Sequence, residues 1–507
     1  MRSERVRLLL FISLACCHGL LYLLVLPPWQ HYDEPTHYEF SRLIAVLGRM
    51  PTLKEVDLPS RRAIGESMIR FHFYNPGEAI PDFTGPQPAR LGYSQQVHPP
   101  FYYTLNAWAI NLAPAASVET QLYIARLVSV LLYTLTILTA WRIVTVSLPE
   151  RPFFRSMLLL LLIFMPAFAD IMSAMNNDVL VNFGMAVLLL GCAYLVRDGL
   201  RPLPLLLALL ALGVAFFAKR TSIVGIVPLA MALFWSLFRR PIPIRFWLSL
   251  LIIAGVAFGL LAFAPTTIKL ADGLHATLGP RPWLAQLDRS YLRLDLARFV
   301  ASLSDIPAGL AVYPNLMYRL FASFWMRYSW GHIRMGSGWE LAMIGVAGSC
   351  AAGLLIRGVR TYRQVGMIEQ RWIWLLLVTA LAATIMTSLR IHPLPIYGGY
   401  SYVPVGRYIY VAIIPVLWLM ALGAEALVPR RWAHYALWLL VGVMLCLDIA
   451  AWAVVIPSYY YQSNFPPTAF AVGKPGLAGW PPIYGLVAIA YLGLVGAVVR
   501  QELRTEK

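Results

Sequence analysis

Long runs of apolar residues recur along this chain, separated by short segments that hold most of its charges. A run of about 20 apolar residues can cross the hydrocarbon core of a membrane as a helix. The runs lie at residues 8–26, 122–146, 156–172, 178–196, 203–218, 221–238, 246–264, 339–356, 372–389, 404–427, 432–456 and 482–499. The pattern predicts an all-α polytopic membrane protein with about 12 transmembrane helices, and roughly 10 to 13 are compatible because three runs are short or poorly separated.

The arginines indicate how these helices are oriented. They gather at every alternate connection, for example at Arg151, Arg197, Arg239, Arg360 and Arg430. Cytoplasmic loops carry this excess of basic residues, so both termini are predicted to be cytoplasmic in a bacterial inner membrane. The long segments 27–121, 265–338, 390–403 and 457–481 then fall on the extracytoplasmic side, where their aromatic residues suit interfacial helices.

Composition narrows the class of protein. Hydrophobic residues make up 59% of the 507 positions and charged residues only 13%, about half the usual share of a soluble domain. The net charge of +17 comes from arginines beside apolar runs, which indicates membrane topology and lipid contact rather than nucleic-acid binding. The five cysteines all lie inside apolar runs and form no CxxC pair, so they are expected to be packing residues.

The strongest local signal, residues 29–39, directly follows the first apolar run and contains two adjacent acids. Asp33 and Glu34 at the membrane boundary can act as a general base or bind a divalent metal, with His31 and His37 as further ligands. The alternative is that one acid caps a helix while the other is solvated. The apolar spacing after Pro35 predicts a short amphipathic helix that ends at Gly48 and lies on the outer membrane surface.

Polar residues also mark two further segments of the same predicted face. Asn177 and Asp178 form a very short connection that brings a second carboxylate to the depth of Asp33, and helix capping is the alternative explanation. His98 precedes two prolines and a cluster of aromatic residues. It is the one residue there with a plausible polar role, although an aromatic membrane anchor explains the segment equally well.

Basic residues on the predicted outer face indicate an anionic ligand. Lys219 and Arg220 form a pair there, against the usual bias, so a phosphate or snorkelling to lipid headgroups can explain them. Arg407, followed by Tyr408, can bind a phosphate or the Asp33 carboxylate through two parallel hydrogen bonds, and Gly406 would let a ligand approach the backbone. Arginines and tryptophans between residues 265 and 338 suit anionic lipid headgroups, a stacked saccharide or an interfacial helix.

The order of these motifs resembles the GT-C superfamily of membrane glycosyltransferases, which use polyprenyl-phosphate sugars. The motifs are most similar to the motifs of a bacterial family of GT-C-like membrane proteins, and most members of that family have no assigned function. The resemblance covers residues 1 to about 430, and a GT-C-like catalytic module (1–430) is expected to precede C-terminal transmembrane helices (431–507). His98 stands where the family pattern has Gln.

The resemblance implies an inverting transfer of a sugar from a polyprenyl-phosphate donor to an envelope lipid, glycan or protein. It implies that Asp33 is the general base and that Asp178 is the second acidic position, a further catalytic residue that orients the acceptor or a metal. Glu34 is a candidate catalytic residue from the sequence pattern, and a divalent metal (Mg²⁺ or Mn²⁺) is an open option at Asp33 and Asp178. The groups assigned to substrate are His98, Asn177, Lys219, Arg220, Arg407 and Tyr408. The competing hypothesis is a transporter or flippase of an anionic lipid or solute, but the charges cluster at helix ends rather than near the membrane midplane.

Overall fold

The computed structural model describes residues 2–52, 55–74, 78–86, 88–92, 94–237, 306–328, 333–361, 367–389, 405–460 and 470–505. The apolar run at 246–264, the segment 390–403 and most of the loop 265–338, with Arg281, Arg289, Arg293 and Arg298, lie outside the described residues.

Helices dominate the described chain. They are α1(Arg2–Val25), α2(Glu34–Leu47), α3(Leu58–Arg70), α4(Phe101–Ile110), α5(Val118–Ser147), α6(Pro152–Ile163), α7(Pro166–Ser173), α8(Asp178–Asp198), α9(Pro202–Phe216), α10(Ile226–Leu237), α16(Ile306–Trp325), α17(Ser337–Thr361), α18(Met367–Leu389), α20(Ile413–Ala426), α21(Ala433–Tyr460) and α22(Pro482–Thr505). The 3-10 helices are η1(Gln95–Val97), η2(Arg220–Gly225), η3(Gly406–Ala412), η4(Arg430–Trp432) and η6(Gly476–Gly479). Strands β1(Arg327–Tyr328) and β2(Ile333–Arg334) pair antiparallel, with Arg327 opposite Arg334.

The all-α polytopic membrane fold is confirmed. Within the described residues, nine helices are long and apolar enough to cross a membrane, or ten if the bent pair of α6 and α7 is one span. These two helices form a 66° bend, and α7 begins with Pro166, which cannot continue a helical hydrogen-bond ladder. Helix α9 has only 15 residues, so the total of about 12 helices stays a prediction.

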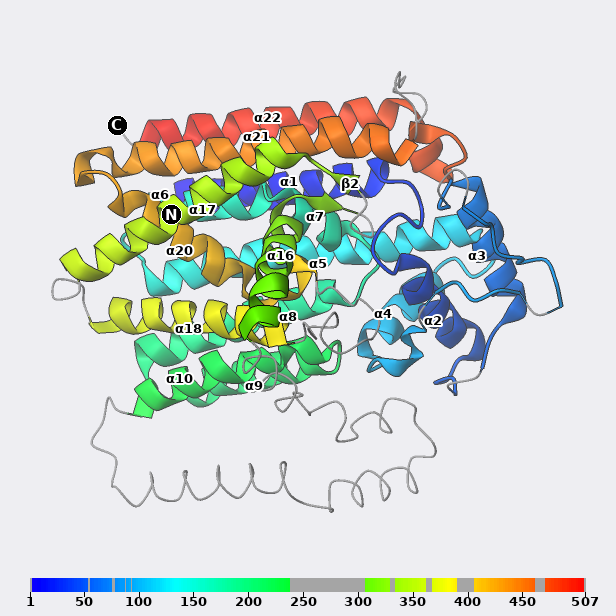
Figure 1. Ribbon diagram of the computed structural model, residues 1–507, viewed down its shortest axis with the longest axis horizontal. Coiled ribbons are helices and arrows are strands. Elements are labelled where there is room, and N and C mark those ends of the chain that lie inside the picture. Colours follow the sequence, from blue (N-terminus) through cyan, green and yellow to red (C-terminus); the bar gives the residue numbers. More distant parts are fainter. Residues whose placement is uncertain are drawn as a thin grey trace, which may run out of the picture.

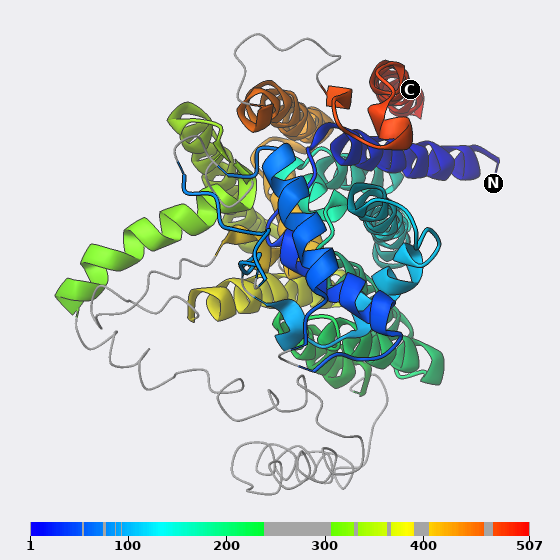
Figure 2. The ribbon, with the colours of Figure 1, turned by 90° about the vertical axis from the view of Figure 1, so that its right-hand side faces the viewer.

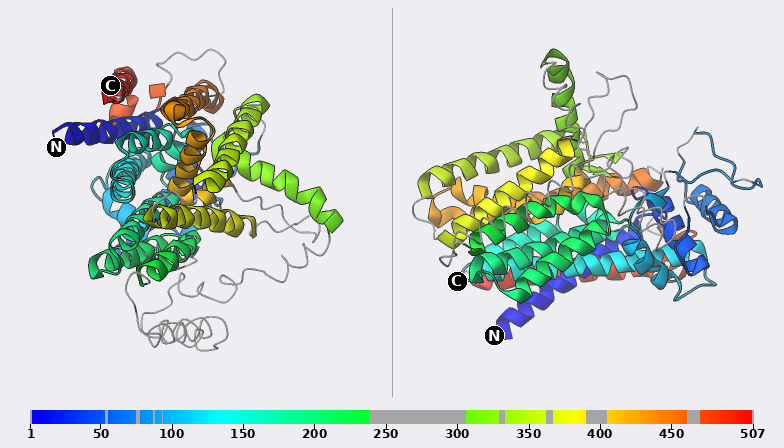
Figure 3. Two further views of the ribbon diagram at one scale, coloured as in Figure 1. Left: turned by 90° about the vertical axis from the view of Figure 1, so that its left-hand side faces the viewer. Right: turned by 90° about the horizontal axis from the view of Figure 1, so that it is seen from below.

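The bundle has two chemically different ends. The two termini lie at one end, and α2, α3 and α4 lie at the other (Figures 1 and 3). At the terminal end, the Arg7 guanidinium contacts Glu502 at 2.8 Å and Arg155 contacts Glu4 at 2.5 Å, which ties the start of α1 to α6 and to the end of α22. Figure 2 looks at the opposite end, where the blue helices lie across the ends of the bundle helices.

The predicted amphipathic helix is present as α2, and Gly48 ends it with a φ of 64°, a left-handed conformation that favours glycine. Helices α3 and α4 pack against it, and its position on the outer membrane surface stays a prediction. Phe40, Leu43 and Ile44 are buried there together with most of its first turn. The apolar face of α2 therefore packs against other parts of the protein.

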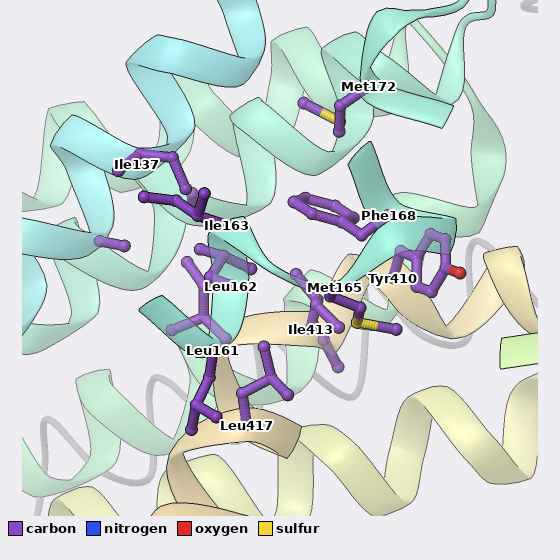
Figure 4. Close-up of a cluster of buried hydrophobic side chains, with 14 of the residues drawn as sticks. Ile137, Leu161, Leu162, Ile163, Met165, Phe168, Met172, Tyr410, Ile413 and Leu417 are labelled. Carbon is purple, nitrogen blue, oxygen red and sulfur yellow. The ribbon is translucent and has the colours of Figure 1, made fainter. Parts of the chain in front are cut away.

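A buried apolar cluster surrounds the bend between α6 and α7. Ile163, Met165 and Phe168 come from the bend, and Tyr410 and Ile413 come from the junction of η3 and α20 (Figure 4). The Phe168 and Tyr410 rings meet edge to face at 5.5 Å. This packing fixes the segment that begins with Arg407 relative to the bend.

The C-terminal helices pack directly on α1. The Asp448 carboxylate of α21 lies 3.0 Å from His18 Nε2 and accepts hydrogen bonds from Tyr22 at 2.9 Å and Tyr491 at 3.2 Å. All four side chains are buried between α1, α21 and α22. The boundary near residue 430 stays a prediction, and these contacts join the helices on its two sides.

Candidate active site

The turn that carries Asp33 has an unusual backbone. Trp29 and Asp33 have φ angles of 74° and 57°, in the left-handed region that residues other than glycine rarely adopt. Asp33 occupies the position before α2, yet its side chain makes no capping hydrogen bond, and its backbone oxygen accepts from Thr36 and His37 instead. The alternative of a helix-capping Asp33 is therefore not what the geometry shows, and the carboxylate points elsewhere.

Glu34 holds this turn in place. Its side chain is fully buried, and both carboxylate oxygens pair with the equally buried Arg126 guanidinium of α5, at 2.9 and 2.6 Å. The backbone amides of Trp29 and Met175 donate to the same carboxylate at 3.0 and 3.1 Å. Burial raises the pKa of Glu34, but the Arg126 and His31 charges and the hydrogen bonds from Arg126 and Met175 together outweigh burial, and the pKa is lowered. Glu34 thus remains ionised and belongs to the framework that holds this turn, and its assignment as a catalytic acid stays a prediction.

Arg126 also donates hydrogen bonds to backbone carbonyl groups at the C-terminal end of α1. Its guanidinium donates to the backbone oxygens of Leu23, Leu26 and Pro27, at 3.3, 3.0 and 2.9 Å. The last carbonyls of a helix have no partners within the helix, so these bonds end α1 cleanly inside a buried region. One arginine therefore connects α1, α5 and the start of α2.

The second acidic motif is attached to the first by its backbone and amide groups. Asn176 Nδ2 donates to the backbone oxygen of Tyr32 at 3.0 Å, and Asn176 Oδ1 accepts from the backbone amide of Asp178 at 2.9 Å. Asn177 Nδ2 reaches the backbone oxygen of Ala218 at 3.3 Å, directly before Lys219. These amides position the two acids and the lysine, and neither Asn177 nor Asp178 uses its side chain as a cap of α8.

Four charged side chains from four distant segments meet at this point, and we refer to them as the charged quartet: Asp33, Asp178, Lys219 and Arg407. Arg407 Nη2 lies 2.7 Å from Asp33 Oδ2, and Arg407 Nε lies 3.7 Å from Asp178 Oδ2. Lys219 Nζ lies 2.5 Å from Asp178 Oδ1. The sequence predicted these four residues on one face of the membrane, and the structure brings them into one alternating chain of acids and bases.

Aromatic rings enclose the two cations of the quartet. The Arg407 guanidinium lies 4.3 Å from the centre of the Tyr32 ring, and Lys219 Nζ lies 4.9 Å from that of Tyr408. Aromatic faces attract cations, most strongly where water is excluded. Tyr408 therefore lies in the site as predicted, and Tyr32 joins it.

Gly406 has a different role from the one expected. A Cβ atom at this position would lie 2.2 Å from the backbone nitrogen of Phe324, so the chain of α16 already occupies the space beside it. The Gly406 amide donates to Ser323 Oγ at 2.7 Å, and the Tyr410 hydroxyl donates to the Phe324 oxygen at 2.8 Å. The expectation that a ligand approaches the backbone here was wrong, because α16 fills this space and braces Arg407.

Two neutral histidines border the quartet. Burial, followed by the charges of Lys219 and Arg220, lowers the pKa of His98 to about 3. Burial and the Lys219 charge likewise place the pKa of His37 well below its ordinary value, and His37 Nδ1 lies 3.0 Å from the Tyr103 hydroxyl. Both rings are therefore uncharged near neutral pH and can only exchange hydrogen bonds with a ligand. His98 lies close enough to Lys219 and Arg220 for their charges to act on its pKa.

Two buried charge partners were not anticipated from the sequence. Arg126 is one, although an arginine inside the apolar run 122–146 is itself a signal of a buried functional or structural partner. Asp170 is the other. It lies within the run 156–172, and its Oδ1 atom is 3.1 Å from His31 Nδ1 with both side chains buried. His31 is thus paired with Asp170 and is not part of the quartet.

The arrangement does not fit a resident divalent metal. Within the ranges that the structure describes, no three His, Cys, Asp or Glu side chains converge as a ligand set. Asp33 and Asp178 both face Arg407, and Asp178 faces Lys219 as well. A metal between the two carboxylates would have these cations beside it, so we derive no step through a metal.

Comparisons with known proteins bear on the fold and family. Residues 97–268 match the family model for dolichyl-phosphate-mannose-protein mannosyltransferase, a region that includes His98, Asn177, Asp178, Lys219 and Arg220. No curated protein matches the chain.

The chain also has distant likenesses to two solved structures. One is ArnT from Cupriavidus metallidurans bound to undecaprenyl phosphate, with 16% identity and a TM-score of 0.43, over 97% of this chain and 73% of that one. The other is the Archaeoglobus fulgidus oligosaccharyltransferase in the apo form, with 15% identity and a TM-score of 0.43, over 94% and 59% of the two chains. The family match confirms the resemblance of this chain to the GT-C superfamily of membrane glycosyltransferases.

Proposed function

We propose that this protein transfers a sugar from a polyprenyl-phosphate donor to an acceptor in the extracytoplasmic envelope, with inversion at the anomeric carbon. The observation that supports this proposal most directly is the charged quartet, because it holds two carboxylates and two cations within contact distance of one another. The family match over residues 97–268 supplies the class of reaction.

In the proposed step, Asp33 takes the proton of an acceptor hydroxyl or amine. The acceptor atom forms a bond to the anomeric carbon while the bond from that carbon to the phosphate oxygen breaks. The electron pair leaves with the polyprenyl phosphate, whose increasing negative charge Lys219 and Arg407 stabilise. Asp178 holds Lys219 in place, since their side-chain atoms lie 2.5 Å apart and both are largely buried.

The donor site is tested by measuring affinity for undecaprenyl phosphate on purified protein in nanodiscs. Arg407→Lys should weaken binding and Arg407→Ala should weaken it further, because an ammonium cannot reproduce the planar guanidinium fork. Lys219→Ala should weaken it comparably, and charged hydrogen bonds of this kind predict losses of about 10- to 100-fold. Unchanged affinity in both the Arg407 and Lys219 variants would remove the phosphate assignment.

The proposed inner-membrane topology places the quartet outside the cytoplasm, and cysteine labelling tests it. In a background without the five native cysteines, Thr84→Cys and Ala115→Cys should react with an impermeant thiol reagent in intact cells. Both positions are exposed, Thr84 between α3 and α4 and Ala115 between α4 and α5. Glu150→Cys, exposed between α5 and α6, should react only after the membrane is permeabilised. The reverse pattern would place the quartet on the cytoplasmic side.

A further inference from the structure

Arg407 has more hydrogen-bonding capacity than its protein partners use. Its side chain is 7% exposed, and among the described residues only its Nη2 atom makes a hydrogen bond, to Asp33 at 2.7 Å. Its Nε and Nη1 atoms are buried without a hydrogen-bond partner among the described residues. Unmet donors on a buried guanidinium are costly, and a phosphate is an acceptor whose geometry matches them.

The charges of the quartet are already balanced. Asp33 and Asp178 supply two negative charges, and Lys219 and Arg407 supply two positive charges. A phosphate that enters this site must therefore share a cation with a carboxylate or displace the carboxylate. Displacement is favoured where the leaving carboxylate can reach water, because an unpaired charge is costly only when it stays buried.

Asp33 is the carboxylate that a phosphate can displace from Arg407. Its side chain is 21% exposed, whereas that of Asp178 is 4% exposed and is held by both Lys219 and Arg407. Its side chain makes no capping bond to α2, and its backbone sits at a φ of 57°. Rotation of this side chain toward water would free Arg407 Nη2 for another acceptor.

We propose that Asp33 and the donor phosphate compete for the Arg407 guanidinium, so that donor binding releases the carboxylate that acts as base. This proposal rests on the proposed function and adds an order of events to it. While Arg407 holds Asp33 Oδ2, that oxygen is not free to accept a proton from the acceptor. Once the phosphate takes the guanidinium, Asp33 is available beside the anomeric carbon, so the base is active only when the donor is present.

The competition predicts that replacing Asp33 raises the affinity for the lipid phosphate, whereas replacing a site residue usually lowers affinity. Asp33→Asn should bind undecaprenyl phosphate more tightly than the wild type, by about 5- to 100-fold on the scale of typical site-to-site couplings. Asp33→Gly should show the same gain, and it guards against misfolding because glycine suits the positive φ of this position. Glu39→Gln is the matched control. Glu39 lies on α2, the helix that follows Asp33, and pairs with Arg61 of α3 at 2.5 Å. The affinity of this variant for undecaprenyl phosphate should not change.

A double variant assigns the effect to Arg407. In an Arg407→Ala background, replacing Asp33 by Asn should give no gain in affinity, because the contested group is absent. A gain that persists there would show that Asp33 repels the lipid by charge alone and would overturn the proposal. Unchanged or weaker binding in both single Asp33 variants would also overturn it, and weaker binding is the result expected if a metal joins Asp33 to the phosphate.

Turnover of the same variants separates this inference from the proposed function. Loss of sugar transfer in Asp33→Asn with unchanged lipid affinity would leave the base role standing and refute the competition. Retained transfer in that variant would refute the base role itself. Tighter lipid binding together with lost transfer is the result that the proposal requires.

Discussion

Asp33→Asn is expected to lower the turnover of sugar transfer by about 10²- to 10⁴-fold, the usual contribution of a general base. The substitution keeps the size of the side chain and can still accept a hydrogen bond from Arg407, but the amide cannot take a proton. Because Asp33 makes no capping bond to α2, the loss cannot be attributed to an uncapped helix. The measurement is the rate of polyprenyl-phosphate release from a labelled donor by purified protein.

The control for this experiment is again Glu39→Gln. It removes an ion pair of similar exposure from the same helix, at a point where Arg61 is the only ion-pair partner that Glu39 has in the described chain. Its turnover should stay within a few-fold of the wild type. Near-normal turnover in Asp33→Asn, with the protein folded, would contradict the assignment of the base.

Arg126→Met is expected to cause the largest loss of stability, about 3–5 kcal/mol, because it leaves the buried Glu34 carboxylate without its counter-charge. Neither side chain has measurable exposure, and the same guanidinium satisfies three carbonyl groups at the end of α1. The free energy of unfolding in mixed micelles, followed by denaturant titration, measures the change.

A more exposed pair provides the comparison. Arg197 contacts Asp198 at 2.7 Å, and the two side chains are 40% and 20% exposed, so Arg197→Met should cost less than about 1 kcal/mol. The double variant of Arg126→Met with Glu34→Gln should lose less stability than the sum of the two single variants, because no buried charge is left unpaired. Equal, small effects of Arg126→Met and Arg197→Met would contradict the framework role of Arg126.

The sequence predicted the members of the quartet better than their arrangement. Asp33, Asp178, Lys219 and Arg407 each follow or begin an apolar run, so the order of runs alone predicted one shared face. Pairing of Arg407 with Asp33 was foreseen as an alternative to phosphate binding, and the structure shows that contact. Their catalytic and binding roles stay predictions.

The sequence did not distinguish the structural roles of adjacent residues. Asp33 and Glu34 look equivalent in the sequence, but the left-handed backbone at Asp33 sends one carboxylate to Arg407 and the other to Arg126. Gly406 meets Phe324, more than 80 positions away, and no local pattern reports such a contact. Sequence periodicity describes the faces of single helices, and these features depend on how distant segments pack.

The decisive measurement is the transfer of labelled sugar from a panel of polyprenyl-phosphate sugars to envelope material, by purified wild-type protein and Asp33→Asn. The proposed function predicts that the wild type moves label from at least one donor, releases polyprenyl phosphate in equal amount and inverts the anomeric configuration, while Asp33→Asn does so at least about 10²-fold more slowly. Equal transfer by both proteins, or lipid-phosphate binding by the wild type without transfer from any donor, would contradict it.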